Sequence, residues 1–331
     1  MTLLTAHLAD PAEYGRVVRE SGTPARIVEY RDASPDERRI TEINSGIYAF
    51  DLTGLFEALS GLAPQNVQGE YYLTDLVDAY RRRSMRVAAV MLEDASEIQG
   101  INSRSELAEV GAIVRAEKNQ QLMAAGVTIE DPSATYVQPD VTVGPDTILH
   151  PGVSLEGQTR IGAGCEIHSG VRIVNSTLGD RVLVRNHCVI VSSRIADDSK
   201  IGPFAHLRPD SDVGSGAHVG NFVELKKTVI GAGSKANHLT YLGDATVGAG
   251  VNVGAGTITC NYDGRNKYQT VIEDEAFIGS DTQLIAPVRI GRGAYVAAGS
   301  SITEDVPPGA LAVARGRQVN KEGWAGKKHG A

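Results

Sequence analysis

The chain of 331 residues is 42% hydrophobic and 22% charged, the composition of an ordinary globular protein. Its net charge is −8 at pH 7 and its basic residues form no long block, so its overall charge argues against nucleic acid or an anionic membrane as a partner. Its 37 glycines and only 5% aromatic residues favour a solenoid that repeats a turn residue over a single compact core.

The cysteines Cys165, Cys188 and Cys260 are odd in number and show no CxxC spacing. This usage indicates buried thiols in a reducing compartment and argues against a structural zinc site. No basic segment followed by an apolar run opens the chain, and no apolar stretch is long enough to span a bilayer. We therefore expect a cytoplasmic protein without a membrane partner.

Residues 1–104 have the mixed pattern of an α/β domain. The pattern predicts strands at 2–6, 26–30, 45–51 and 86–92, and helices at 52–62 and 73–83. The first predicted strand begins at once, and about a hundred residues are few for such a sheet. We therefore expect residues 1–104 to be the back part of a larger domain.

A single helix is expected next, over residues 105–127. Apolar residues recur at helical spacing between Leu107 and Leu122, Glu106 lies in the first turn, and Gly126 can end the helix as a C-cap. We interpret this helix as a linker to the repeat that follows.

Residues 128–306 repeat with a period of six. A helical period of 3.6 cannot hold that register over roughly a hundred residues, so the pattern indicates a parallel β-helix of hexapeptide repeats. Three hexapeptides make a coil of about eighteen residues with its aliphatic side chains inward. Five-residue steps at Leu178 and Ile195 predict coils of seventeen. The inward series is Val137, Val143, Leu149, Leu155, Ile161, Ile167, Ile173, Leu178, Ile195, Ile201, Leu207, Val213, Val219, Leu225, Ile230, Ala236, Leu242, Val247, Val253 and Thr259.

The register breaks between Thr259 and Ile272 for an excursion that carries Asn261, Tyr262 and Lys267. Irregular loops on a regular scaffold are where binding and catalytic residues concentrate. The coils resume after the excursion, and residues 307–331 form a polar tail.

Side chains at equivalent positions of successive coils should lie side by side, because stacked strands are about 4.8 Å apart. Arg208 and Lys226 are eighteen residues apart, and each follows an inward residue. Two adjacent cations repel each other unless an anion lies between them, and a phosphate suits a guanidinium beside an ammonium. We favour a phosphate site over a solvated pair on an outer face.

The same count places His238 beside Asn221, and Tyr241 beside Glu224, each pair seventeen residues apart. An imidazole titrates near neutral pH, so a histidine held among an amide, a carboxylate and a phenol suits a general base. A histidine without such neighbours would be an ordinary surface residue.

His150 and His168 also stack, eighteen residues apart. Catalytic zinc needs three protein ligands, and the next histidine, His187, falls two places later in its hexapeptide. The spacing therefore disfavours a zinc site, and it leaves the role of this pair open.

Several stretches carry a specific family resemblance: HVGNFVELKK at 218–227, HLTYLGD at 238–244, NVGAGTITCNYDG at 252–264, FIGS at 277–280 and KEGW at 321–324. They resemble the acetyltransferase half of the bacterial bifunctional N-acetylglucosamine-1-phosphate uridyltransferase/glucosamine-1-phosphate N-acetyltransferase family. The resemblance extends over essentially the whole chain.

This resemblance implies a left-handed parallel β-helix that forms a homotrimer with active sites at subunit interfaces. It implies acetyl-CoA as the donor and glucosamine-1-phosphate as the acceptor in UDP-N-acetylglucosamine biosynthesis. By position, His238 would be the catalytic base. The sugar phosphate would be bound by Arg208, Lys226, Tyr241, Asn252 and Lys267, and acetyl-CoA by Ala255, Asn261, Tyr262, Ser280, Ala298 and Arg315.

Residues 1–104 resemble part of the same family's α/β, Rossmann-like nucleotidyltransferase domain. Tyr14-Gly15, Glu29 and Asn44 match its uracil-binding and sugar-binding residues, and Asn102 matches a Mg²⁺ ligand. The triphosphate loop and the aspartate that shares the Mg²⁺ have no counterpart in the chain, and one neutral amide does not make a metal site. We therefore expect acetyl transfer without uridylyl transfer.

Three other functions are weighed against acetyl transfer. The first is the complete bifunctional activity, which needs the missing triphosphate loop. The second is a non-enzymatic solenoid scaffold, which has no use for convergent cations such as Arg208 and Lys226. The third is a zinc hydratase at His150 and His168.

Overall fold

The computed structural model describes residues 1–101 and 103–325. The chain divides into two compact units, Met1–Val110 and Gly111–Ala331, and each is described by itself. The domain boundaries expected from the sequence, at residues 104, 127 and 306, stay predictions.

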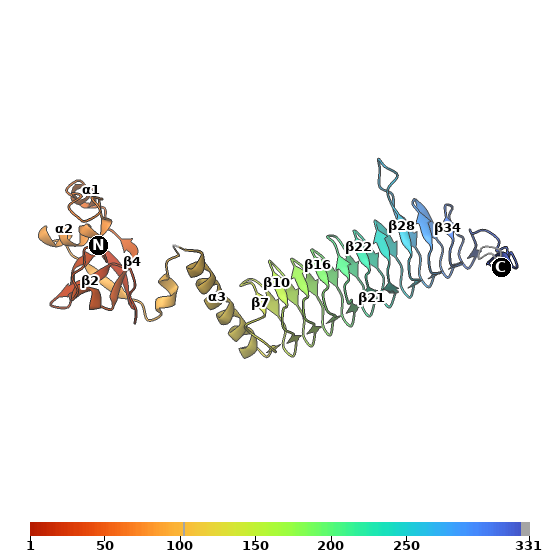
Figure 1. The fold of residues 1–331 in the computed structure, drawn as a ribbon, viewed down its shortest axis with the longest axis horizontal. Helices are drawn as coiled ribbons and strands as arrows, with labels where there is room; N and C mark the ends of the chain where they lie inside the picture. The colour runs from red at the N-terminus through yellow and green to blue at the C-terminus, as the bar shows by residue number, and fades with distance from the viewer. Residues whose placement is uncertain (102, 326–331) are drawn as a thin grey trace. The chain divides into compact units, whose positions relative to one another are not determined.

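The front unit is built on a sheet with the strand order β3-β2-β4-β1-β5 (Figure 1). Strands β1 and β5 are parallel, and the other pairs are antiparallel. Two α-helices and three 3₁₀ helices accompany the sheet within residues 1–101. The elements are β1 (Thr2–His7), β2 (Arg16–Glu20), β3 (Thr23–Val28), η1 (Glu37–Arg39), β4 (Glu42–Ala49), α1 (Leu55–Leu59), η2 (Leu73–Asp75), α2 (Leu76–Arg82), β5 (Ala88–Met91) and η3 (Ala95–Ile98).

The core of the front unit lies between this sheet and the two α-helices. Leu3 and Val17 from the strands and Leu76, Val77 and Tyr80 from α2 are all buried in one cluster. The four predicted strands and both predicted helices are present, although α1 is shorter than the predicted 52–62. Strand β2 was not predicted.

Helix α3 (Arg104–Ala124) is the expected linker helix. Gly126 follows it with φ of +94°, and the N–H of Val127 donates to the carbonyl of Leu122, which closes the C-terminal turn. The buried Asn119 donates to the carbonyls of Pro132 and Thr135 at 2.9 and 3.0 Å. The end of α3 thereby covers the first coil of the solenoid, which an open β-solenoid requires.

The solenoid is a three-sided stack in which strands from every third hexapeptide pair in parallel (Figure 1). The ten-stranded sheet contains β7 (Tyr136–Val137), β10 (Ser154–Glu156), β13 (Arg172–Val174), β16 (Val189–Val191), β19 (His206–Leu207), β22 (Glu224–Lys226), β25 (Tyr241–Gly243), β28 (Ile258–Cys260), β31 (Gln283–Ile285) and β34 (Ser301–Ile302). The nine-stranded sheet contains β8 (Thr142–Val143), β11 (Arg160–Ile161), β14 (Thr177–Leu178), β17 (Arg194–Ile195), β20 (Asp212–Val213), β23 (Val229–Ile230), β26 (Ala245–Val247), β29 (Thr270–Ile272) and β32 (Val288–Ile290).

The third side of the stack is the eleven-stranded sheet. It contains β6 (Thr128–Ile129), β9 (Ile148–Leu149), β12 (Glu166–Ile167), β15 (Leu183–Val184), β18 (Lys200–Ile201), β21 (His218–Asn221), β24 (Lys235–His238), β27 (Asn252–Val253), β30 (Phe277–Ile278), β33 (Tyr295–Val296) and β35 (Leu311–Ala312). The expected fold class is confirmed: a parallel β-helix of hexapeptide coils, left-handed as the resemblance implies, follows a helix and an α/β unit.

The predicted register of the coils is confirmed. Ile161 pairs with Leu178 and Leu178 with Ile195, which are steps of seventeen residues, whereas Ile195 pairs with Val213 after eighteen. The inward side chains form one continuous buried cluster along the solenoid. Burial of this aliphatic column stabilises the stack, since apolar surface removed from water contributes about 25 cal/mol per Å².

A glycine directly after an inward residue, such as Gly231 after Ile230, lets the backbones of successive coils approach each other closely. A Cβ on Gly231 would lie 2.3 Å from the carbonyl oxygen of Gly248 in the next coil, well inside van der Waals contact. The backbone of Gly231 does not have a positive φ. Glycine is therefore needed here for space, and not for an unusual backbone conformation.

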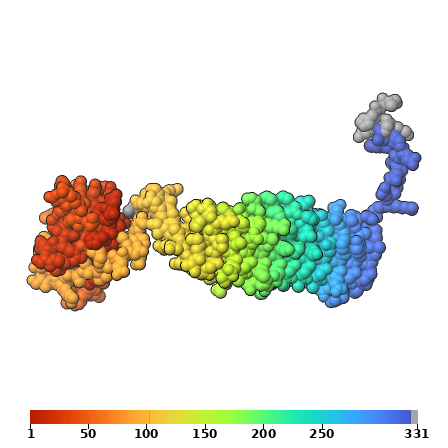
Figure 2. All heavy atoms as spheres, turned by 90° about the horizontal axis from the view of Figure 1, so that it is seen from below, coloured from red at the N-terminus to blue at the C-terminus, as the bar shows by residue number. Residues whose placement is uncertain are grey.

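Two segments leave the regular stack. Residues 261–269 project beside β28 (Figure 1), as the break in the repeat predicts. Residues 313–325, which follow β35, run away from the end of the solenoid (Figure 2). Within residues 1–101 and 103–325, no helix combines the length and the apolar character needed to cross a lipid bilayer.

Gly231→Ala is predicted to destabilise the solenoid by about 1–3 kcal/mol or more, because the added methyl group overpacks a backbone contact. Urea unfolding measures the change. The control is Gly111→Ala in α3, where a Cβ meets nothing within 4 Å and alanine favours the helix. Equal unfolding free energies for the two variants would contradict this account of the glycine.

Candidate active site

One edge of the solenoid carries the candidate base and several candidate acetyl-CoA residues. This edge follows the ends of the strands of the eleven-stranded sheet. Each residue lies two positions after an inward aliphatic residue, and those aliphatic residues pair from coil to coil. In order along the edge, the residues are Asn221, His238, Ala255, Ser280 and Ala298. The sequence register predicted that Asn221 and His238 lie side by side. The structure shows that Ala255, Ser280 and Ala298 follow them along the same edge.

His238 is exposed at the end of β24, and its Nδ1 lies 2.6 Å from Oδ1 of Asn221. An amide oxygen can only accept, so this contact assigns the proton to Nδ1 and leaves the Nε2 lone pair of the neutral ring free. Tyr241 begins the next strand only three residues later, so it lies within about 10 Å along the chain. The expected Asn221–His238 and Glu224–Tyr241 pairings are both confirmed.

Arg208 and Lys226 occupy equivalent positions of adjacent coils in the ten-stranded sheet, as expected. Each cation already has a carboxylate partner. Arg208 Nη1 lies 2.9 Å from Glu224, and Lys226 Nζ lies 3.5 Å from Asp244. The repulsion between the two cations is thus partly compensated within the chain. Asp244, which is half-buried, was not among the predicted site residues.

Lys267 returns from the projecting loop to Lys226. The hydrogen bond and the charge of Lys226 lower the pKa of Lys267. The hydrogen bond with Lys267 and the charge of Asp244 raise the pKa of Lys226. Lys226 therefore keeps its proton more firmly, and Lys267 gives one up more readily. An anion between the two amines would favour both protonated forms.

The projecting loop is held together by its own polar groups. Backbone N–H groups of Arg265 and Asn266 each donate to the Asp263 carboxylate at 2.7 Å, and they lower its pKa. A β-bridge joins Tyr262 to Lys267. This tight turn brings Lys267 back toward the ten-stranded sheet.

Gly243 makes room for two predicted site residues. A Cβ at Gly243 would lie 2.3 Å from the Tyr241 hydroxyl and 2.9 Å from Nδ2 of Asn261. Asn261 is buried, and its Nδ2 donates to Asp244. The absence of a side chain at Gly243 thus lets a phenol, an amide and a carboxylate converge beside Lys226.

Arg315 lies against the far end of the edge. Its Nη1 donates to the carbonyl oxygen of Ala298 at 2.7 Å, and its side chain is exposed. The structure thus brings these two predicted acetyl-CoA residues together. Tyr262 is exposed on the projecting loop.

Asn252 does not join the cation group. It begins β27 in the eleven-stranded sheet, whereas Arg208 and Lys226 lie in the ten-stranded sheet. A single chain therefore does not gather all five predicted phosphate ligands at one point.

In the front unit, three of the predicted residues cluster. A Cβ on Gly15 would lie 3.2 Å from the Glu29 carboxylate, and the Asn44 N–H donates to the Gly15 carbonyl at 2.9 Å. Glu29 also accepts a hydrogen bond from Thr74 at 3.1 Å, and the hydroxyl of Tyr14 accepts one from the Gly100 N–H at 2.8 Å. Asn102, the expected Mg²⁺ ligand, lies outside the described residues.

Comparisons with known proteins agree with this architecture. Two family models match: "GMPPB C-terminal domain" over residues 127–211 and "Bacterial transferase hexapeptide (six repeats)" over residues 269–304. The bifunctional protein GlmU of Koribacter versatilis is 54% identical over 332 residues, which cover 99% of this chain and 71% of that protein.

The chain belongs to the bifunctional GlmU family. The GlmU protein of Trichlorobacter lovleyi is 51% identical over 329 residues, covering 99% of this chain and 72% of that protein. A solved UDP-N-acetylglucosamine acyltransferase from Arabidopsis is 18% identical, with a TM-score of 0.41 over 54% of this chain and 69% of that one.

Lys267 is predicted to react with trinitrobenzenesulfonate faster in the wild type than in Lys226→Met between about pH 8 and 9. A lowered pKa leaves more of the amine neutral and nucleophilic, and removing Lys226 raises that pKa again. Peptide mapping by mass spectrometry reports the site. Lys200→Met, several coils away, is the control and should not change the rate. An unchanged rate in Lys226→Met would show that the two amines do not interact.

Proposed function

We propose that this chain transfers the acetyl group of acetyl-CoA to the amino group of glucosamine-1-phosphate, a step toward UDP-N-acetylglucosamine. The observation that carries the proposal is the position of His238. It hydrogen-bonds to Asn221 and belongs to the line of edge residues that continues with Ala255. Tyr241, three residues later, begins the strand that pairs with the strand of Lys226. A base, a line of small residues and a cation group thus lie on neighbouring coils, which a scaffold protein would not need.

The base acts on the ammonium form of the acceptor. Since His238 Nδ1 donates to Asn221, the free Nε2 lone pair can take a proton from the sugar ammonium. The neutral amine then attacks the thioester carbonyl, the C–N bond forms and the C–S bond breaks. The nitrogen loses its second proton to the departing thiolate, so that coenzyme A leaves as the free thiol. Asn221 is a positioning residue in this scheme, because it fixes the ring and its tautomer.

The phosphate of the acceptor would bind to Arg208, Lys226 and Lys267, with Tyr241 as a further hydrogen-bond donor. Lys226 and Lys267 perturb each other's pKa, and a dianionic phosphate relieves that repulsion. The proposed gain in rate comes largely from orientation, because anchoring the phosphate fixes the neighbouring amine against the base.

Acetyl-CoA would run along the edge formed by Ala255, Ser280 and Ala298. Their small side chains let a thioester arm approach the backbone closely, and Arg315 beside Ala298 offers a cation for the phosphates of coenzyme A. Asn261 and Tyr262 would border the acetyl end. With its phosphates at Arg315 and its acetyl end at Asn261, acetyl-CoA would have its thioester next to His238, which lies one coil before Ala255 on the edge.

The active protein is proposed to be a homotrimer in the cytoplasm with shared active sites. Asn252 lies on a different side of the solenoid from Arg208 and Lys226, so a neighbouring chain has to supply it to the same phosphate. In the proposed trimer, the three solenoids pack side by side, with the eleven-stranded sheet of one chain against the ten-stranded sheet of another.

For the front unit we propose only a partial nucleotide-sugar site at Gly15, Glu29 and Asn44. Magnesium needs several oxygen ligands in near-octahedral geometry, and a single amide from Asn102 does not fit that requirement. No step of uridylyl transfer is therefore assigned to this chain.

His238→Ala is predicted to lower kcat for acetyl transfer by about 10²–10⁴-fold while acetyl-CoA still binds, since a general base contributes that factor in the transition state. Release of free thiol measures turnover, and calorimetry measures acetyl-CoA binding. His187→Ala, another exposed histidine on the same edge region, should retain full activity. A loss smaller than about tenfold in His238→Ala would exclude His238 as the base.

Mixing Arg208→Ala chains with Asn252→Ala chains is predicted to restore part of the activity that each variant lacks. In a mixed trimer at least one site receives both intact side chains. Co-refolded mixtures are assayed by thiol release, and native mass spectrometry confirms that mixed trimers form. If mixed trimers are as inactive as either parent, both residues serve a site within one chain.

A further inference from the structure

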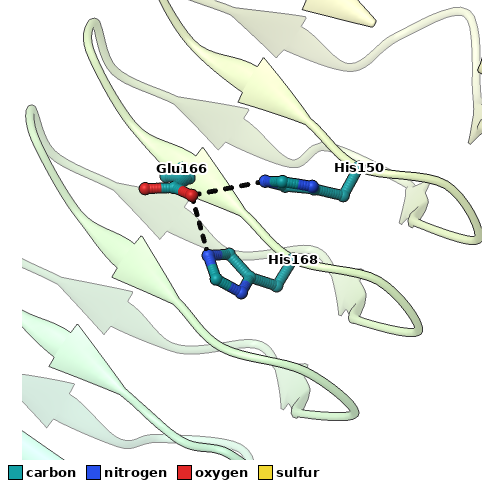
Figure 3. Close-up of side chains that lie close together, drawn as sticks. All are labelled: His150, Glu166 and His168. Carbon is teal, nitrogen blue, oxygen red and sulfur yellow. Dashed lines mark hydrogen bonds and ion pairs between the residues drawn. The ribbon is translucent and has the colours of Figure 1, made fainter. Parts of the chain in front are cut away.

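A second cluster of chemically active side chains lies at the front of the solenoid, remote from the proposed acetyltransferase site. His150 follows β9, and Glu166 and His168 lie at the start and just after the end of β12 (Figure 3). The three donor atoms lie within 4.8 Å of one another. The sequence register predicted the histidine stack, but it counted only histidines and missed Glu166.

Strand geometry explains why the carboxylate joins the histidines. Glu166 and His168 are two residues apart, so their side chains leave the strand on the same face. His150 stacks on His168 from the preceding coil, with ring centroids 4.7 Å apart. As Figure 3 shows, both Nε2 atoms point at Oε1 of Glu166, at 3.3 Å from His150 and 2.9 Å from His168.

The outer nitrogens of both rings are also held. Nδ1 of His150 lies 3.0 Å from the Glu130 carboxylate, and Nδ1 of His168 lies 3.4 Å from Oδ1 of Asn186. Each ring nitrogen therefore faces an acceptor: without a metal ion, a neutral ring donates either its Nδ1–H to the outer partner or its Nε2–H to Glu166. A histidine that binds a metal through Nε2 usually donates Nδ1–H to such an acceptor.

In the tautomer with both protons on Nδ1, two Nε2 lone pairs are directed at a carboxylate oxygen. Lone pairs in this arrangement repel one another unless a cation lies among them. With neutral rings, the carboxylates of Glu130 and Glu166 give the group a charge of −2, which a divalent ion neutralises. Tetrahedral ligands at about 2.0–2.1 Å from zinc lie about 3.3–3.4 Å apart. The Nε2–Oε1 separation of 3.3 Å at His150 matches this value, and the separation of 2.9 Å at His168 is shorter.

We propose that His150, Glu166 and His168 bind a divalent transition-metal ion of the zinc class, with Glu130 and Asn186 orienting the two imidazoles. Two imidazoles and one carboxylate suit Zn²⁺ better than Mg²⁺ or Ca²⁺, which prefer oxygen ligands. The ion joins the coils of β9 and β12, and Glu130 after β6 extends the network to a third coil. The site therefore staples the front coils of the solenoid.

The metal site is separate from acetyl transfer. Four steps in the eleven-stranded sheet separate β12 from β24, which carries His238. At about 4.8 Å per step the two sites are about 19 Å apart. Loss of the metal should therefore leave acetyl transfer intact. A failure of the metal-site proposal would not count against the proposed acetyl transfer, and the reverse also holds.

The test is titration of chelator-treated full-length protein with Zn²⁺ by calorimetry and with Co²⁺ by visible absorption. We expect one Zn²⁺ per chain and a Co²⁺ d–d band of a four- or five-coordinate site. His150→Ala and His168→Ala should each weaken Zn²⁺ binding at least 100-fold, and Glu166→Gln at least tenfold. Glu130→Gln should weaken it by about 10–100-fold through the ring it orients.

His206→Ala and Glu156→Gln, which alter the same residue types in the ten-stranded sheet, are the controls and should bind Zn²⁺ like the wild type. Circular dichroism checks folding, and the partly exposed Glu166→Gln keeps the shape of the side chain. Zn²⁺ should also slow amide exchange in β9 and β12 in the wild type only. Equal Zn²⁺ affinity in the wild type and in a His150→Ala/His168→Ala double variant would overturn the proposal.

Discussion

The hydrogen bonds between successive coils are the constraint on which the rest of the structure depends. Most strand residues of the solenoid pair with a residue seventeen or eighteen positions later. The step is longer where the loop adds residues and in the first coil, and shorter in the last coil. A side chain on the surface therefore has a fixed neighbour above and below it at strand spacing. The Asn221–His238 pair and the His150–His168 pair are two products of this one rule, and neither requires a flexible segment to bring its members together.

The same rule explains what the sequence predicts about the fold. A six-residue period gives the coil, its inward face and even the seventeen-residue steps, because every repeat must satisfy the same packing. The front unit has no such repeat. Strand β2 escapes prediction because its two valines are followed by Arg19 and Glu20, two charged residues that pair with Glu42 of β4 and with Arg81 of α2. Helix α1 is short because only its first turns bury Leu55 and Ala58.

At the candidate site, the register of the hexapeptide repeat predicts which residues lie side by side in successive coils. It does not predict which carboxylates form ion pairs with them. Arg208 and Lys226 are adjacent as expected. Each also forms an ion pair with a carboxylate, Glu224 or Asp244, and these ion pairs depend on side-chain conformations that the repeat does not determine. Lys267 reaches Lys226 through a loop that has no period, so only its three-dimensional path reveals the contact. Glu166 was missed for a simpler reason: a search for stacked histidines ignores a carboxylate two residues away on the same face.

The division between periodic and irregular segments also separates two tasks of the proposed site. The stack provides groups that must not move, such as His238 and Lys226, and holds each in a strand by pairing with a neighbouring coil: His238 with Asn221 and Lys226 with Gly243. The proposed binding groups Tyr262, Lys267 and Arg315 belong to segments outside the stack: the first two to the loop, and Arg315 to the residues after the last coil. These three side chains are exposed, and Lys267 and Arg315 contact the stack at Lys226 and Ala298. A base fixed in the stack and binding groups on segments outside it suit an enzyme that must admit a long donor and still hold the reacting amine in place.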